Sequence, residues 1–180
     1  MHITRRKLLI STLTLLIAGP LQAGWDPGER AEIERKAHDT VQEFSRKDPS
    51  LQRFFSKAAG WAVFPTVGKG GIGIGGAYGE GVLYQGGKVV GYTDVKQLTI
   101  GFQFGGQAYS EIIFFKDKAA VDRFKAEKLE FDAQASAVAA TVGAAANADY
   151  SKGVAVFTMV KGGLMYEATI GGQSFGYTPR

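Results

Sequence analysis

Residues 60–83 decide the fold, and they read GWAVFPTVGKGGIGIGGAYGEGVL. Apolar residues alternate with small or polar ones through this stretch, which is the period-two pattern of β-strands. Glycines occupy five odd-numbered positions between 71 and 81, so they line one face of an extended hairpin. A strand face without side chains is approached closely, either by the protein's own backbone or by a ligand. The second alternative makes Gly73 and Gly75 candidate lipid-binding residues.

The alternating pattern continues on the C-terminal side of this hairpin and resumes near the end of the chain. Apolar and β-branched residues recur at every second position, and glycine-rich turns separate the runs. The pattern predicts strands at residues 61–67, 72–78, 82–84, 89–93, 98–104, 109–115, 154–160, 164–170 and 174–177.

Helices are predicted mainly before the first strand. Asp26 is placed to cap a helix over residues 25–47, with proline next and a glutamate at the capping-box position. Asp48-Pro49 repeats this signal and begins a second, short helix. Asp117 caps a later helix, whereas the alanine-rich residues 133–148 fit either a helix or a strand.

This order of elements predicts an α+β fold. We expect a curled, barrel-like antiparallel β-sheet with N-terminal helices and one later helix packed on it, because strands follow strands without intervening helices. Aromatic side chains should supply much of the core, each contributing about 1.5–3 kcal/mol when fully buried. The expected core aromatics are Trp61, Phe64, Tyr78, Phe102, Phe104, Phe114, Phe115, Phe124 and Phe157.

Composition argues against several classes of function. The 180 residues contain no cysteine and two histidines, which excludes disulfides, thiolate metal sites and multi-histidine metal sites. Residues 71–76 spell a dinucleotide-binding pattern, but strand-like residues follow where that site requires a helix. The carboxylates are scattered, and no serine lies in a nucleophile-elbow context. The sequence therefore predicts neither an enzyme nor a cofactor.

Residues 1–23 resemble a signal peptide. Arg5, Arg6 and Lys7 precede a short apolar run, and Ala23 is the small residue expected before cleavage. The paired arginines also fit a twin-arginine signal, although general secretion is the preferred interpretation. We expect an exported, periplasmic protein that is either soluble or peripheral to a membrane. Without the leader the net charge falls from +4 to +1, which argues against nucleic acid as a partner.

Charge is divided by segment in the remaining chain. Residues 24–49 and 111–149 are each net acidic, whereas residues 50–110 and 150–180 are net basic. A mildly basic β surface could meet anionic lipid headgroups, at about 1 kcal/mol for each cation near a charged bilayer. Ordinary solvated lysines at turns explain the same pattern.

Several motifs, in order along the chain, resemble the SYLF-domain family. The opening signature is KAAGWAVFP at residues 57–65, and GGAYGEG at residues 75–81 is similar to the family's glycine hairpin. GFQFGGQ at residues 101–107 is similar to its central strand, and YSKG at 150–153 with KGG at 161–163 to its closing segment. The resemblance spans residues 51–177 and is closest to the exported bacterial branch.

This resemblance implies lipid binding. Family members associate with phospholipids, and the parts implicated in membrane contact correspond here to Phe54, Phe55, Lys57 and Trp61, with Lys69 at the following turn. Eukaryotic members carry a Gly-Pro-x-Gly-Arg turn, but residues 136–144 contain no arginine, so phosphoinositide specificity is not implied.

The resulting organisation is a signal peptide (1–23), an N-terminal helical segment (24–50) and a SYLF-like lipid-binding domain (51–180). The predicted function is non-catalytic binding of a phospholipid or an anionic membrane surface in the bacterial cell envelope. The alternative is a structural component of the periplasm that binds a protein partner and no lipid.

Overall fold

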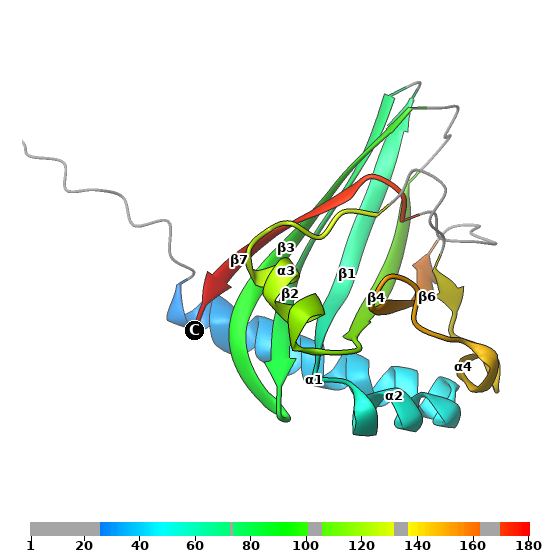
Figure 1. Ribbon diagram of the computed structural model, residues 1–180. Helices are drawn as coiled ribbons and strands as arrows, with labels where there is room; N and C mark the ends of the chain where they lie inside the picture. The colour runs from blue at the N-terminus through cyan, green and yellow to red at the C-terminus, as the bar shows by residue number, and fades with distance from the viewer. Residues whose placement is uncertain (1–25, 73, 101–105, 132–136, 163–169) are drawn as a thin grey trace, which may run out of the picture.

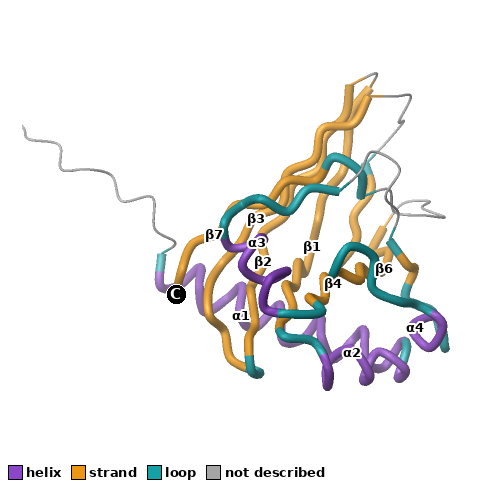
Figure 2. Tube along the Cα trace, in the orientation of Figure 1, coloured by secondary structure: helices purple, strands orange, loops and turns teal. Residues whose placement is uncertain are grey.

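A seven-stranded sheet forms the centre of the structure (Figures 1 and 2). The computed structural model describes residues 26–72, 74–100, 106–131, 137–162 and 170–180. The order across the sheet is β5-β6-β4-β1-β2-β3-β7. The strands are β1 (Gly60–Ile72), β2 (Ile74–Gln85), β3 (Lys88–Ile100), β4 (Gln107–Phe115), β5 (Val138–Ala139), β6 (Val154–Gly162) and β7 (Gln173–Pro179).

Helices pack on both faces of this sheet. The first face carries α1 (Pro27–Lys47), the 3-10 helix η1 (Pro49–Leu51) and α2 (Gln52–Lys57), and the second face carries α3 (Lys118–Lys125). A short helix, α4 (Ala144–Asn147), lies near η1. Within the described residues, no helix is both long enough and apolar enough to cross a bilayer.

The α+β fold class and the N-terminal helices are confirmed, but the predicted barrel-like antiparallel sheet is wrong. Strand β5 pairs in parallel with β6, so the sheet is mixed. In the described part of the chain, β5 and β7 remain as the two edges of an open sheet. One physical reason is the length of β5, because its two residues offer too little backbone to join the opposite edge.

A β-bulge in β1 accounts for the glycines that suggested strong curling. The register of β1 shifts between Val63 and Thr66 against β2. A Cβ atom at Gly81 would lie 2.5 Å from the Val63 carbonyl oxygen, and one at Gly79 would lie 2.7 Å from the Thr66 carbonyl oxygen. The protein's own backbone therefore fills the space beside these two glycines. At Gly79 and Gly81 the close approach is made by backbone and not by a ligand.

Strands β2 and β3 are longer than the sequence pattern predicted. The strands expected at residues 72–78 and 82–84 merge into β2, because its glycines pair with β1 instead of forming a turn. The chain turns only at Gly86 and Gly87, whose φ angles of +56° and +74° favour glycine. The strand expected at residues 164–170 falls almost entirely outside the described residues.

The predicted helix caps are confirmed. The Asp26 carboxylate accepts a hydrogen bond from the Gly28 N–H, and Glu29 accepts one from the Asp26 N–H, which completes the capping box of α1. Asp48 caps η1 and Asp117 caps α3 in the same manner. The alanine-rich segment yields both β5 and α4, while residues 132–136 lie outside the described part.

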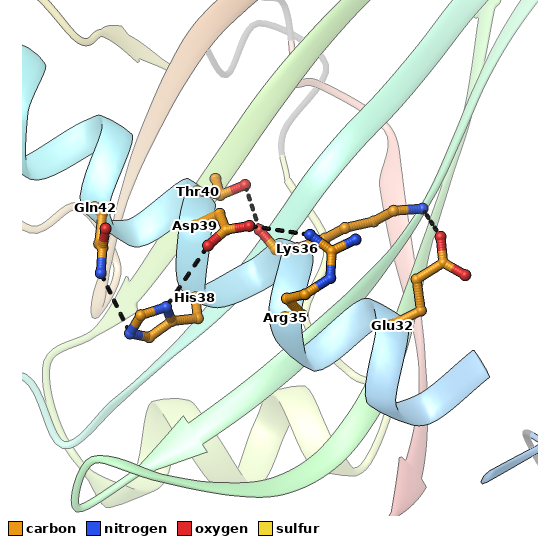
Figure 3. Close-up of polar contacts among 7 residues, drawn as sticks. All are labelled: Glu32, Arg35, Lys36, His38, Asp39, Thr40 and Gln42. Atoms are coloured by element: carbon orange, nitrogen blue, oxygen red, sulfur yellow. Dashed lines mark hydrogen bonds and ion pairs between the residues drawn. The ribbon is translucent and has the colours of Figure 1, made fainter. Parts of the chain in front are cut away.

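The outer side of α1 is a solvated charged surface (Figure 3). Glu32 pairs with Lys36 and Arg35 pairs with Asp39, each at i,i+4 spacing. His38 is exposed beside Asp39, as expected for a surface histidine. The opposite side of α1 carries Ile33, Ala37, Thr40 and Phe44 into the core.

The core divides into two apolar clusters, one on each face of the sheet. Five of the nine predicted core aromatics are fully buried: Phe64, Phe114, Phe115, Phe124 and Phe157. Trp61 is half-buried. Tyr78 is 50% exposed, so its prediction was wrong; it lines an open hollow beside Ile33 and Lys36 of α1 and is not packed under the helix. Phe102 and Phe104 lie outside the described residues.

A buried carboxylate joins the N-terminal helices to the start of α4. Asp48 is fully buried and accepts hydrogen bonds from the Ser50 N–H and hydroxyl, from the Gly143 N–H at 3.1 Å and from the Ala145 N–H at 2.7 Å. Burial alone would raise the pKa of Asp48, but these hydrogen bonds outweigh it and hold the pKa below its ordinary value.

Replacing Asp48 with alanine should lower the free energy of unfolding by about 2–4 kcal/mol at pH 7, because several buried N–H groups lose their acceptor. Since the folded pKa is depressed, the stabilisation is present above the unfolded pKa and is lost as pH falls through the folded pKa. Urea unfolding at pH 7 and pH 3 measures both effects. Asp39→Asn, at an exposed carboxylate on α1, is the control. Equal losses in the two variants would contradict the role given to Asp48.

Candidate functional site

Three of the predicted site residues come together where α2 meets β1. The Phe55 ring lies 5.4 Å from the Trp61 ring and 4.8 Å from the Phe114 ring, both edge-on. Phe54 is 2% exposed and packs against Phe157 in the same cluster. These aromatic side chains mainly anchor α2 to the sheet, so they offer little free surface to a ligand.

Lys57 lies on the exposed side of α2 and lines a small cleft. The cleft has a volume of about 200 Å³ and is formed by Arg53, Phe54, Lys57, Asp149 and Tyr150; we call it the α2 cleft. Arg53 and Lys57 are four residues apart, so both cations lie on one side of the helix. The Arg53 guanidinium lies 4.6 Å from the centre of the Phe54 ring and donates to the Ala148 carbonyl oxygen. The sequence analysis missed Arg53, although its spacing from Lys57 was a signal.

Lys69 does not join Lys57 and Trp61. It lies eight residues beyond Trp61 in β1, a separation of roughly 26 Å along a strand. The bulge also reverses the alternation of β1, so Val67 and Lys69 face the side of the sheet opposite to Val63. Lys69 is only 9% exposed, and burial lowers its pKa.

The two predicted glycines also lie away from α2. Gly75 is buried near the far end of the hairpin, where it pairs with Gly71 of β1 and Thr99 of β3. Gly73 lies outside the described residues. The structure therefore separates the predicted set into an α2 group and a distant group.

A second hollow has three cationic side chains in its lining. It has a volume of about 650 Å³, and its lining residues are Glu43, Arg46, Lys47, Met159, Val160 and Lys161; we call it the basic groove. The three cations are exposed, and the half-buried Met159 lies on the same sheet face as α1. Val160 pairs with Tyr109 and faces the opposite side of the sheet. Three exposed cations around one hollow can bind a negatively charged group.

The sequence analysis missed the basic groove because its parts are far apart in the chain. Arg46 and Lys47 end a segment whose net charge is negative, and Lys161 lies in β6. The signal was local, because two adjacent cations stand in the last turn of α1. The helix dipole favours cations at that position, which is a sufficient reason for them without any ligand.

Glu111 of β4 has a fully buried side chain, and the pKa of its carboxyl group departs strongly from the ordinary value. The Gln173 side-chain amide of β7 donates to Glu111 Oε2 at 3.1 Å and to the Tyr109 hydroxyl oxygen at 3.3 Å. Burial raises the pKa of Glu111 to about 7. Glu111 has no exposed surface, and the described residues contain no group of three or more histidine, aspartate or glutamate side chains suited to a metal ion. We therefore read it as a structural link between β4 and β7.

The raised pKa makes Glu111 a source of pH-dependent stability. The Glu111 carboxyl group ionises near pH 4.5 in the unfolded chain and near pH 7 in the folded protein. The free energy of unfolding therefore falls by about 3 kcal/mol as the pH rises through this interval, and it is constant above it. Glu111→Gln should remove most of this dependence and stabilise the protein at pH 8. Thermal unfolding from pH 4 to pH 8 measures the effect, with Glu80→Gln as the exposed control. Parallel pH profiles for wild type and Glu111→Gln would refute it.

Comparisons with known proteins agree with the motifs. Residues 96–176 match the family described as "Ysc84: Las17-binding protein actin regulator". Beta cell expansion factor A from Aeromonas veronii is 29% identical over 148 residues, which cover 81% of this chain and 56% of that protein. The matched part is thus little more than half of that relative's length. The family match begins within β3, so it includes Lys161 of the basic groove and excludes α1 and α2.

Proposed function

Because the chain carries a domain of the Ysc84 (SYLF) family, we propose that it binds phospholipid at a membrane surface through the basic groove, without catalysing a reaction. The observation that carries this proposal is the grouping of three exposed cations, Arg46, Lys47 and Lys161, around one hollow. Domains of this family generally bind a ligand without catalysis, and the resemblance of this chain to them implies that the ligand is phospholipid.

The chemistry of the groove suits a lipid surface. Lipid phosphates carry negative charge, and each cation near an anionic bilayer contributes about 1 kcal/mol. The half-buried Met159, which also lines the groove, adds apolar contact below the headgroups. Arg53 and Lys57 of the α2 cleft extend the positive charge along the N-terminal helices.

The cell envelope is the place we propose for this activity. The leader over residues 1–23 has the sequence of a secretion signal, and an exported protein meets phospholipid surfaces outside the cytoplasm. The location rests on the sequence of that leader.

A charge-reversed double variant, Lys47→Glu with Lys161→Glu, tests the basic groove. Each reversal removes an attraction of about 1 kcal/mol and adds repulsion, so affinity for anionic vesicles should fall at least tenfold. Co-sedimentation with anionic and neutral vesicles at two salt concentrations measures this fall. Lys88→Glu, at the exposed first residue of β3, is the single-charge control, and Lys88→Glu with Lys96→Glu matches the change in net charge.

Two results would count against the proposal. The first is wild-type protein that binds neither kind of vesicle. The second is an equal loss in the groove variant and in the charge-matched control, which would indicate attraction by net charge and not by a site.

A protein partner is the second candidate function, and one surface favours it. Tyr78 of β2 and Leu98 of β3 lie on the same face of the sheet. Leu98 is 70% exposed and Tyr78 is 50% exposed. Gly68 and Gly70 lie on the same stretch of β1 with open space where a side chain would stand. A stable, lipid-free complex that Leu98→Asp abolishes, and the groove variant does not, would support this alternative.

A further inference from the structure

An apolar pocket shares Asp149 with the α2 cleft. It has a volume of about 230 Å³, and its apolar wall consists of Leu129, Phe131, Val138, Val154, Val156 and Ile170. Asp149 lines both this pocket and the α2 cleft, so the two hollows adjoin.

The size and lining of the pocket fit a single aliphatic chain. Leu129, Val154 and Val156 are each 6–7% exposed, so the wall is formed by core side chains in a fixed position. An apolar cavity of about 150 Å³ stays dry and binds benzene in another protein, and drug-sized ligands need roughly 300 Å³ or more. A pocket of 230 Å³ lies between these limits, which leaves room for a short length of one chain and not for two.

The pocket lies at an edge of β6 that its neighbours cover only in part. Strand β5 pairs with β6 only at Phe157 and Thr158, and Ser151 pairs with Val154 through two backbone hydrogen bonds of 2.8 and 3.0 Å. Val156 lies between these two pairings. The Arg123 guanidinium donates to the Lys152 carbonyl oxygen at 3.0 Å and holds the turn that borders the opening.

Charges of both signs surround the mouth. Glu130, Asp149 and Lys152 are exposed charges in the lining of the pocket, while Arg53 and Lys57 line the α2 cleft, which shares Asp149 with it. A simple fatty acid would place its carboxylate among two acids and a single cation, Lys152, so the net charge of the rim is unfavourable to it. A zwitterionic headgroup matches the arrangement, because its phosphate can face the cations while its ammonium group faces the carboxylates.

We propose that this pocket takes one acyl chain of a zwitterionic phospholipid, with the phosphate at Arg53 and Lys57 and the ammonium group at Asp149 and Glu130. The inference rests on the proposed function, since it names the lipid class that a phospholipid-binding protein would take up. It concerns a different site from the basic groove and can therefore fail separately.

Monomeric lysophosphatidylcholine is the probe, because it has one chain and a zwitterionic head. Titration followed by amide chemical shifts, below the concentration at which the lipid forms micelles, should give saturable binding with shifts around Val156 and Asp149. Lysophosphatidylglycerol, with the same chain and no ammonium group, should bind at least fivefold more weakly.

Two variants separate the parts of the site. Ala148→Phe fills the pocket from its rim and should weaken lysophosphatidylcholine binding at least tenfold. Asp149→Lys, at an exposed position, should remove the preference for the zwitterionic head and leave chain binding in place. Val142→Phe is the control for Ala148→Phe, because Val142 is 85% exposed and lies outside the pocket. If Ala148→Phe does not fold, the headgroup preference of wild type and its loss in Asp149→Lys still decide the question.

The outcomes distinguish this inference from the proposed function. Wild-type protein that binds vesicles but not lysophosphatidylcholine overturns the pocket and leaves the basic groove standing. Saturable binding of lysophosphatidylcholine without vesicle binding supports the pocket and overturns the groove. Equal affinity for the two lysolipids, unchanged in Asp149→Lys, overturns the assignment of a zwitterionic ligand.

Discussion

The close approach of β1 to two glycines of β2 is the constraint on which the rest of the structure depends. A side chain at Gly81 would collide with the Val63 carbonyl oxygen, so the bulge of β1 requires glycine there. The bulge reverses which residues of β1 face the helices: Val63 belongs to the cluster under α1 and α2, whereas Val67 belongs to the opposite cluster. Alternation alone places Ala62 and Val63 in different halves of the core, and the bulge then moves Val67 and the residues after it to the face opposite to the one that alternation predicts.

The same bulge explains which parts of the site the sequence could predict. Helix caps depend on residues within one turn, so Asp26, Asp48 and Asp117 were found from the sequence alone. The face on which each side chain of β1 lies is predicted from the alternation of successive residues between the two faces. One extra residue in the strand moves every later side chain to the other face. Lys69 was therefore assigned to the same site as Trp61, although the two residues face opposite sides of the sheet. The glycine pattern could not reveal this, because a bulge and a ligand-facing strand both favour glycine.

Charge was harder to predict than packing because segments of opposite net charge meet in space. The segment containing α1 is acidic overall, yet its last turn places Arg46 and Lys47 beside Lys161 of β6. Phe54 and Phe55, which were predicted to bind lipid, are packed against the sheet, and this packing fixes the side of α2 on which Arg53 and Lys57 are exposed. The aromatic cluster thus positions these two cations.

The position of Asp48 links the two hollows mechanically. Its carboxylate ties the end of α1, which carries the cations of the basic groove, to Gly143 and Ala145, a few residues before the segment that separates the α2 cleft from the apolar pocket. A rigid connection of this kind keeps the basic groove and the apolar pocket, two separate proposed sites, at a fixed spacing, so neither has to be ordered when a lipid binds. Because this tie is buried and fully hydrogen-bonded, a lipid at either hollow would meet a surface that is already arranged, and its binding free energy would not be reduced by the cost of closing the site.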